Sequence, residues 1–190
     1  MKPDYPILEF ADALKWRKWL DARHADTQGV WLRFYKKASG VTAVTYDQAL
    51  DHALCYGWID GQTKKYDELS YLQKFTPRRS RSMWSKRNIA HIARLRRAKL
   101  LMPAGLAEVK RAQADGRWEA AYDSSSEMVL PEDFLDAVRS NKKTAAFFET
   151  LGRTHRFMIG LRLQTAKKPE TRARRMQRIL ESLKKGEKPA

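Results

Sequence analysis

The sequence predicts an α+β protein, in which N-terminal helices and a small antiparallel sheet of about three strands precede an all-helical C-terminal part. Two patterns predict this class. Apolar and polar side chains alternate from residue 30 to 37, as in a half-buried strand, and apolar side chains recur at helical spacing in many other segments. A serine-containing break follows Trp118. We therefore predict an N-terminal unit over 1–122, a linker over 123–130 and a helical unit over 131–190.

The first predicted helices have recognisable start and stop signals. One helix spans residues 10–24, with an apolar stripe of Phe10, Ala13, Trp16 and Leu20. Thr45 and Gln48 fit a capping box at the start of a second helix, and Gly57 is placed to end that helix in a left-handed conformation. Both helices are expected to dock their apolar stripes on the rest of the unit.

The strand predicted from residue 30 has two different faces. Its core-facing side chains are Val30, Leu32 and Phe34. The side chains of the second face are Trp31, Arg33, Tyr35 and Lys37. They could line a binding groove or pack across the sheet with their cations solvated, and the sequence leaves both alternatives open.

A hairpin is predicted from residues 62–66 and 70–75. Asp60 and Gly61 are expected to form a turn before it, because Asp followed by Gly is common turn chemistry. Pro77 disfavours helix before it, so TPRRSRSMW is expected to be a loop, and Ser85 can cap the helix that follows. The later helices are predicted over residues 86–101, 103–115, 131–140, 141–152, 154–168 and 169–185.

The charge balance favours anionic partners. The formal net charge is +16 and the isoelectric point is about 10.1, which favours nucleic acid, phosphorylated metabolites or an anionic membrane surface. Two basic helical stretches, Arg94 to Lys99 and Arg172 to Arg178, could contact a nucleic-acid backbone, remain solvated, or approach an anionic lipid surface.

Several other features narrow the class of protein. No segment approaches the ~20 apolar residues of a membrane span, and no secretory signal is visible, so we expect a cytoplasmic protein. Cys55 is the single cysteine and is expected to be a buried, inert thiol. The scattered histidines lack ligand spacing, and the common nucleotide-binding and hydrolase motifs do not occur. We therefore expect no metal and no cofactor.

Long motifs in the chain resemble a bacterial family. These are GWIDG from Gly57, SYLQKFTPRRSRSMWSKRN from Ser70, LMPAGLAEVKRAQADGRW from Leu101 and LQTAKKPETRARRMQRILESL from Leu163. Together they resemble the YdeI/OmpD-associated proteins, also described as bacteriocin-protection proteins, over roughly residues 29–185. The resemblance implies a stress-tolerance phenotype, specifically tolerance of membrane-active peptides, and no particular reaction.

The segment between Trp58 and Lys86 is the candidate ligand-binding site. Arginine forks suit phosphate or carboxylate, a helix start adds free N–H groups, and aromatic rings offer faces for stacking. The candidate residues are Trp58, Asp60, Gly61, Lys64, Tyr71, Phe75, Arg78, Arg79, Trp84, Ser85 and Lys86. The alternative is a structural network in which Arg78 or Arg79 bonds Asp60 and the aromatic rings belong to the core.

These observations lead to one main hypothesis and two alternatives. The main hypothesis is a cytoplasmic binding protein with an aromatic and arginine-lined pocket for an anionic ligand, either a phosphorylated small molecule or nucleic acid. The first alternative is an enzyme that uses Asp60 as a general acid or base on an anionic substrate. The second is a basic adaptor for nucleic acid or for a membrane surface, without a membrane span.

Overall fold

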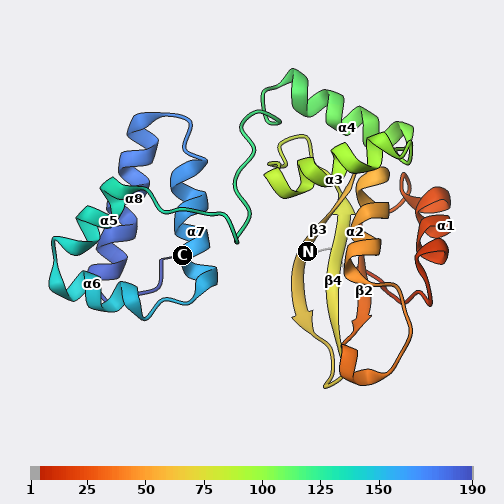
Figure 1. Cartoon of the computed structure of the whole chain (residues 1–190), viewed down its shortest axis with the longest axis horizontal. Coiled ribbons are helices and arrows are strands. Elements are labelled where there is room, and N and C mark those ends of the chain that lie inside the picture. The colour runs from red at the N-terminus through yellow and green to blue at the C-terminus, as the bar shows by residue number, and fades with distance from the viewer. Residues whose placement is uncertain (1–4, 190) are drawn as a thin grey trace. The chain divides into compact units, whose positions relative to one another are not determined.

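The computed structural model describes residues 5–189 and contains two compact units (Figure 1). The first unit comprises residues 5–83 and 88–119, and the second comprises residues 84–87 and 120–189. The first unit contains a four-stranded sheet with helices, and the second is helical apart from one isolated bridge. The predicted α+β class is confirmed.

The sheet has the strand order β1-β2-β4-β3. Its strands are β1 (Ile7–Leu8), β2 (Val30–Tyr35), β3 (Trp58–Lys65) and β4 (Ser70–Pro77). β4 lies antiparallel to both β2 and β3, whereas the two-residue β1 adds a parallel pair at the edge of β2. The predicted β2 and hairpin are therefore present, and β1 is an addition that the sequence pattern did not predict.

The hairpin is longer than predicted because GWIDG continues into strand β3. Asp60 is paired with Phe75 of β4, so the predicted turn at Asp60 and Gly61 was wrong. The chain departs from regular pairing between Asp60 and Thr63, where a β-bulge shifts the register. A bulge accommodates an Asp-Gly pair inside a strand because the extra residue relaxes the ladder locally.

Helices α1 (Ala13–Arg23) and α2 (Tyr46–Cys55) pack on one face of the sheet (Figure 1). Asp12 caps α1, and the predicted capping box of Thr45 and Gln48 is present at the start of α2. Trp16 of α1 is fully buried, and the centroid of its ring lies 5.9 Å from that of Phe75. Its indole N–H also donates a 3.0 Å hydrogen bond to the carbonyl of Ala49. These contacts join both helices to the sheet around one aromatic core.

The remaining helices of the first unit follow the hairpin. Gly57 ends α2 with a φ of +75°, as predicted. α3 (Lys86–Arg97) ends earlier than predicted, and its first two residues belong to the second unit. α4 (Pro103–Ala114) starts with the predicted proline. Gly105 of α4 lies against the C-terminal end of α2, since a Cβ atom built on it would lie 2.3 Å from the carbonyl oxygen of Cys55.

The second unit is a bundle of four helices that were all predicted. They are α5 (Glu132–Arg139), α6 (Lys142–Glu149), α7 (Arg153–Gln164) and α8 (Pro169–Lys184). Their apolar stripes meet in a core that includes Phe134, Phe148, Leu163, Ile179 and Leu183. Residues 124–130 carry no regular element longer than a turn, and Met128 lies against Gly160 of α7.

Candidate functional site

The aromatic residues of the predicted site are mostly core residues. Trp58 and Phe75 are 1% and 0% exposed, and Trp58 donates a hydrogen bond from Nε1 to the carbonyl of His24. Tyr71 is half-buried and stacks on Phe34 at 5.5 Å, and burial raises the pKa of its hydroxyl. These rings stabilise the contact between sheet and helices, which leaves little of their surface for a ligand.

Asp60 forms a hydrogen bond with a tyrosine of α2. It lies on the helix-covered face, opposite Phe75, and its Oδ2 accepts a 2.7 Å hydrogen bond from the hydroxyl of Tyr46 on α2. Gly61 lies in the bulge, where a Cβ atom would come within 3.3 Å of the Lys74 side chain. The Asp60 carboxylate therefore links β3 to α2.

The two neighbouring arginines of the TPRR motif lie in different environments. Arg78 is 6% exposed, and its guanidinium donates a 3.2 Å hydrogen bond to the carbonyl of Met83. Its backbone N–H also donates to the carbonyl of Gly57 at 2.9 Å. Arg79 has an exposed side chain, and its backbone N–H donates to the hydroxyl of Ser82. Arg78 thus holds the loop from inside, and Arg79 extends from its surface.

The last three predicted residues belong to the second unit. Trp84 is 1% exposed, and Ser85 is buried and forms an isolated parallel bridge with Tyr122. Lys86 forms a 2.6 Å ion pair with Asp123. The hydrogen bond within this ion pair raises the pKa of Lys86 and lowers that of Asp123. The predicted residues are therefore divided between the two units.

Lys64 is the predicted residue that points to a different surface. Lys64 pairs with Leu72 of β4. The β2 residue that pairs with Leu72, and its alternate neighbours along β2, lie on the face of the sheet opposite to α1 and α2. We define the cation–aromatic face as the following side chains of that surface: Tyr5, Trp31, Arg33, Tyr35, Lys64, Tyr66 and Lys74. All of them are partly or fully exposed.

Trp31 lies at the centre of the cationic part of this face. The Lys64 Nζ atom lies 4.3 Å from the centroid of the Trp31 ring, and the Lys74 Nζ atom lies 5.7 Å from it. Lys74 also lies 5.5 Å from the ring of Tyr5 and donates a 3.2 Å hydrogen bond to the side chain of Gln62. Within residues 5–189, neither lysine pairs with a carboxylate. Both charges are available to an anion.

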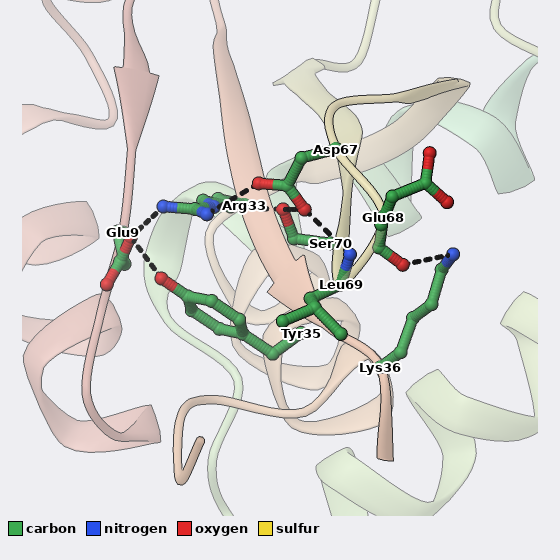
Figure 2. Close-up of polar contacts among 8 residues, drawn as sticks. All are labelled: Glu9, Arg33, Tyr35, Lys36, Asp67, Glu68, Leu69 and Ser70. Carbon is green, nitrogen blue, oxygen red and sulfur yellow. Dashed lines mark hydrogen bonds and ion pairs between the residues drawn. The ribbon is translucent and has the colours of Figure 1, made fainter. Parts of the chain in front are cut away.

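Arg33 is held by two carboxylates at the other end of the cation–aromatic face (Figure 2). Its guanidinium forms ion pairs with Glu9 at 3.3 Å and with Asp67 at 2.7 Å, and its Nε donates to the hydroxyl of Ser70 at 3.0 Å. The same guanidinium lies over the rings of Tyr35 and Tyr66, at 4.7 and 4.8 Å. Arg33 therefore fixes two rings in place, while its charge is neutralised locally.

Hydrogen bonds in this network shift the pKa of two members. The pKa of Tyr35 is raised, chiefly because its hydroxyl donates a 2.9 Å hydrogen bond to Glu9. The pKa of Asp67 is lowered, first by the hydrogen bond from Ser70 and also by that from Arg33. Asp67 also accepts from the backbone N–H of Leu69, so the hairpin turn is tied to β2 (Figure 2).

The sequence predicted only part of this surface. The alternation along β2 singled out Trp31, Arg33 and Tyr35 as a candidate groove or packed face. Lys37, proposed for the same face, lies beyond the strand in a short 3-10 helix, Lys37–Ser39. Tyr5 and Tyr66 gave no signal, because Tyr5 precedes an unpredicted strand and Tyr66 follows the last residue of β3.

A second polar cluster connects α2 to α3. Asp51 accepts hydrogen bonds from Arg94 at 2.6 and 2.7 Å and lies 2.8 Å from Nδ1 of His91. Burial alone would raise the pKa of Asp51, but the hydrogen bonds from Arg94 and His91 outweigh this effect, and the pKa is lowered. Nearby Cys55 is buried, and burial raises the pKa of its thiol to about 11. The cluster is a polar contact between helices with an unreactive thiol beneath it.

Among residues 5–189, no three His, Cys, Asp or Glu side chains form a group that could hold a metal ion. Over the same range, every helix is too short or too polar to cross a lipid bilayer.

Comparison with known families assigns both parts of the chain. A model described as Domain of unknown function (DUF8412) matches residues 8–108, which is more than half of the chain. The chain belongs to this family. The DUF8412 region contains β2, β3 and β4 and every residue of the cation–aromatic face except Tyr5. No curated protein and no solved structure matches the chain significantly.

The C-terminal part matches a second family model, described as Bacteriocin-protection, YdeI or OmpD-Associated, over residues 127–186. This match confirms the resemblance inferred from the sequence, and the family is linked to bacteriocin protection. It covers α5 to α8, whereas the GWIDG and TPRR motifs lie in the DUF8412 region. Apart from residues 84–87, which belong to the second unit, the two family regions correspond to different units of the fold.

Proposed function

We propose that this protein binds single-stranded nucleic acid through the cation–aromatic face of its first unit. The observation that carries the proposal is the position of Lys64 and Lys74 beside the partly exposed ring of Trp31. Proteins that bind single strands without strong sequence preference combine cations that contact the backbone with aromatic rings that stack on bases. This surface offers both kinds of side chain.

The arrangement of the face supports a strand more than a small phosphorylated molecule. Trp31 and Tyr35 lie on the same side of β2, four residues apart, and the rings of Tyr66 and Tyr5 lie beside Arg33 and Lys74 on the same surface. Aromatic rings at several positions along a β-strand can stack on successive bases of a nucleic-acid strand, whereas a small metabolite would stack on only one of them. The net charge of +16 adds a long-range attraction for a polyanion.

The two ends of the face have different proposed tasks. Lys64 and Lys74, which have no carboxylate partner among the described residues, would contact phosphates. Trp31 would stack on a base after the lysine side chains move toward the phosphates. Arg33 is neutralised by Glu9 and Asp67, so its task would be to hold the rings of Tyr35 and Tyr66. This division separates charge contacts from stacking contacts.

Fluorescence anisotropy of a labelled 12-nucleotide oligothymidylate tests the proposal. The Trp31→Leu variant should bind roughly tenfold more weakly, because base stacking on an aromatic ring contributes about 1–3 kcal/mol. A Lys64→Ala, Lys74→Ala variant should also bind roughly tenfold more weakly in low salt. Lys65→Ala is the matched control, because Lys65 lies on the opposite face of the same strand and pairs with Glu68.

The same measurement defines what would contradict the proposal. Equal affinity of the wild-type protein and of the Trp31 and double-lysine variants would exclude this face as the binding surface. A tenfold loss in the Lys65→Ala control would show that only total charge matters. Tighter binding of a 12-base-pair duplex than of the single strand would also contradict the proposal, because paired bases cannot stack on Trp31.

A further inference from the structure

The helical second unit contains a cavity of about 730 Å³ that the proposed function does not use. It is open to the surface and is lined by residues of α5, α6, the start of α7 and the segment that precedes α5. The volume lies in the range of pockets that bind small organic molecules, roughly 300–1,000 Å³. All of its lining residues belong to the second unit.

The inner wall of the cavity is apolar. Its apolar lining includes Leu130, Leu135, Val138, Phe148, Leu151 and Phe157. Val138, Phe148 and Leu151 also belong to the core cluster of the bundle and are only 3–4% exposed. Val129, which also lines the cavity, is 81% exposed. The core is therefore continuous with an apolar opening at the surface, where an apolar ligand would remove further surface from water.

Two pairs of opposite charges line the same cavity. Glu132 forms a 2.8 Å ion pair with Arg139, and Glu149 forms a 2.9 Å ion pair with Arg156. Arg156 also donates to the carbonyls of Leu151 and Phe148 and lies 4.7 Å from the ring of Phe148. Its role is to close the C-terminal end of α6. Within each of these pairs, the charge of the glutamate offsets that of the arginine.

Arg153 is the third arginine of the lining and has a different set of contacts. Its guanidinium makes only long hydrogen bonds of 3.3 and 3.4 Å to the carbonyl of Ser125, and no carboxylate pairs with it among the described residues. The lining has three arginines and two glutamates, and Asp136 just outside it also pairs with Arg139, so the cation that a ligand could pair with is that of Arg153. The cavity thus combines an apolar wall with one uncompensated cation at its edge.

We propose that this cavity binds a small amphiphile that has one apolar chain or ring system and one anionic head group. The apolar part would lie against Phe148 and Leu151, and the carboxylate, sulfonate or phosphate head would pair with Arg153. This site lies in the region matched by the bacteriocin-protection family, and it is independent of the cation–aromatic face of the first unit.

A fluorescent fatty acid, 11-(dansylamino)undecanoic acid, provides the direct probe for the full-length chain. Its emission should rise and shift to the blue on binding, and dodecanoate should displace it at lower concentration than dodecanol does. Dodecyltrimethylammonium has the same chain length and the opposite charge, so it should compete least. If dodecanol and dodecyltrimethylammonium compete as well as dodecanoate, the proposed role of an anionic head group is wrong.

Two substitutions with matched controls locate the site. Ala145→Leu should project into the cavity, obstruct it and lower the affinity for the probe roughly tenfold, while Ala146→Leu, its exposed neighbour outside the lining, should not. Arg153→Glu should lower the affinity for dodecanoate roughly fivefold and leave that for dodecanol unchanged. Arg162→Glu is the charge control, since Arg162 lies on the same helix but outside the cavity.

Circular dichroism and thermal melting confirm that each variant is folded before its binding is compared. Unchanged probe binding in both Ala145→Leu and Arg153→Glu would overturn the proposal. Equal losses in Arg153→Glu and Arg162→Glu would also overturn it, because the binding would then follow the overall charge of the protein.

Discussion

At the scale of single residues, neighbouring side chains of the same type have different tasks. Arg78 and Arg79 both belong to the TPRR motif, and the sequence placed both in the candidate ligand site. The structure buries Arg78 at 6% exposure with a hydrogen bond to Met83, while the Arg79 side chain is exposed. The hydrogen bond to the Met83 carbonyl replaces one of the water contacts that this guanidinium loses on burial, and so offsets part of the cost of burying it.

The Arg78→Ala variant should therefore lose about 2–3 kcal/mol of unfolding free energy, because it removes a charged hydrogen bond and leaves a cavity. Arg79→Ala should change this free energy by less than about 0.5 kcal/mol, as expected of an exposed position. Urea denaturation followed by circular dichroism measures both values. Equal losses in the two variants would show that the motif acts as one unit.

A second prediction at this scale concerns pH. The pKa of Asp51 is lowered below its ordinary value of 3.8, so this carboxylate stabilises the folded state above that value and stops doing so as the pH falls through its lower, folded-state pKa. Asp51→Asn should cost about 1 kcal/mol at pH 7, since the pair with Arg94 is partly exposed. Thermal melts from pH 7 to pH 3 should show this deficit shrinking. A deficit that stays constant with pH would contradict the assignment.

At the scale of elements, the sequence predicted what local chemistry determines. The capping box at Thr45, the left-handed Gly57 and the apolar stripes of the helices depend on residues close together in the chain. The β-bulge does not, because it depends on how β3 pairs with β4. Strict alternation from Asp60 would put Lys64 on the helix-covered face, but the bulge shifts the register and puts it beside Trp31.

Close packing of α4 on α2 yields a prediction at the same scale. Gly105→Ala should lower the unfolding free energy by about 2 kcal/mol, although alanine favours helix, because the new Cβ would meet the Cys55 carbonyl at 2.3 Å. Ala107→Gly in the same helix is the control and should cost about 1 kcal/mol from helix propensity alone. Denaturant titration measures both. A Gly105→Ala variant as stable as the wild type would mean that the two helices separate easily.

At the scale of the whole molecule, two units with different family matches carry two different proposed sites. The charge of +16 and the rings of β2 pointed from the sequence toward an anionic ligand. The full extent of the surface could not be predicted, because Tyr5, Lys64 and Lys74 join Trp31 only through strand pairing. The aromatic residues of the GWIDG region turned out to be core, since long-range packing decides which side of a strand is covered.

The salt dependence of oligothymidylate binding tests the central claim most directly. Each lysine that contacts a phosphate releases counterions, so the slope of log affinity against log salt should become shallower by about 0.7 per lost contact. The Lys64→Ala, Lys74→Ala variant should therefore differ from the wild type by about 1.4 in slope. Lys65→Ala should retain the wild-type slope, since Lys65 lies on the opposite face and already pairs with Glu68. Equal slopes for all three proteins would contradict the proposal that single-stranded nucleic acid binds at the cation–aromatic face.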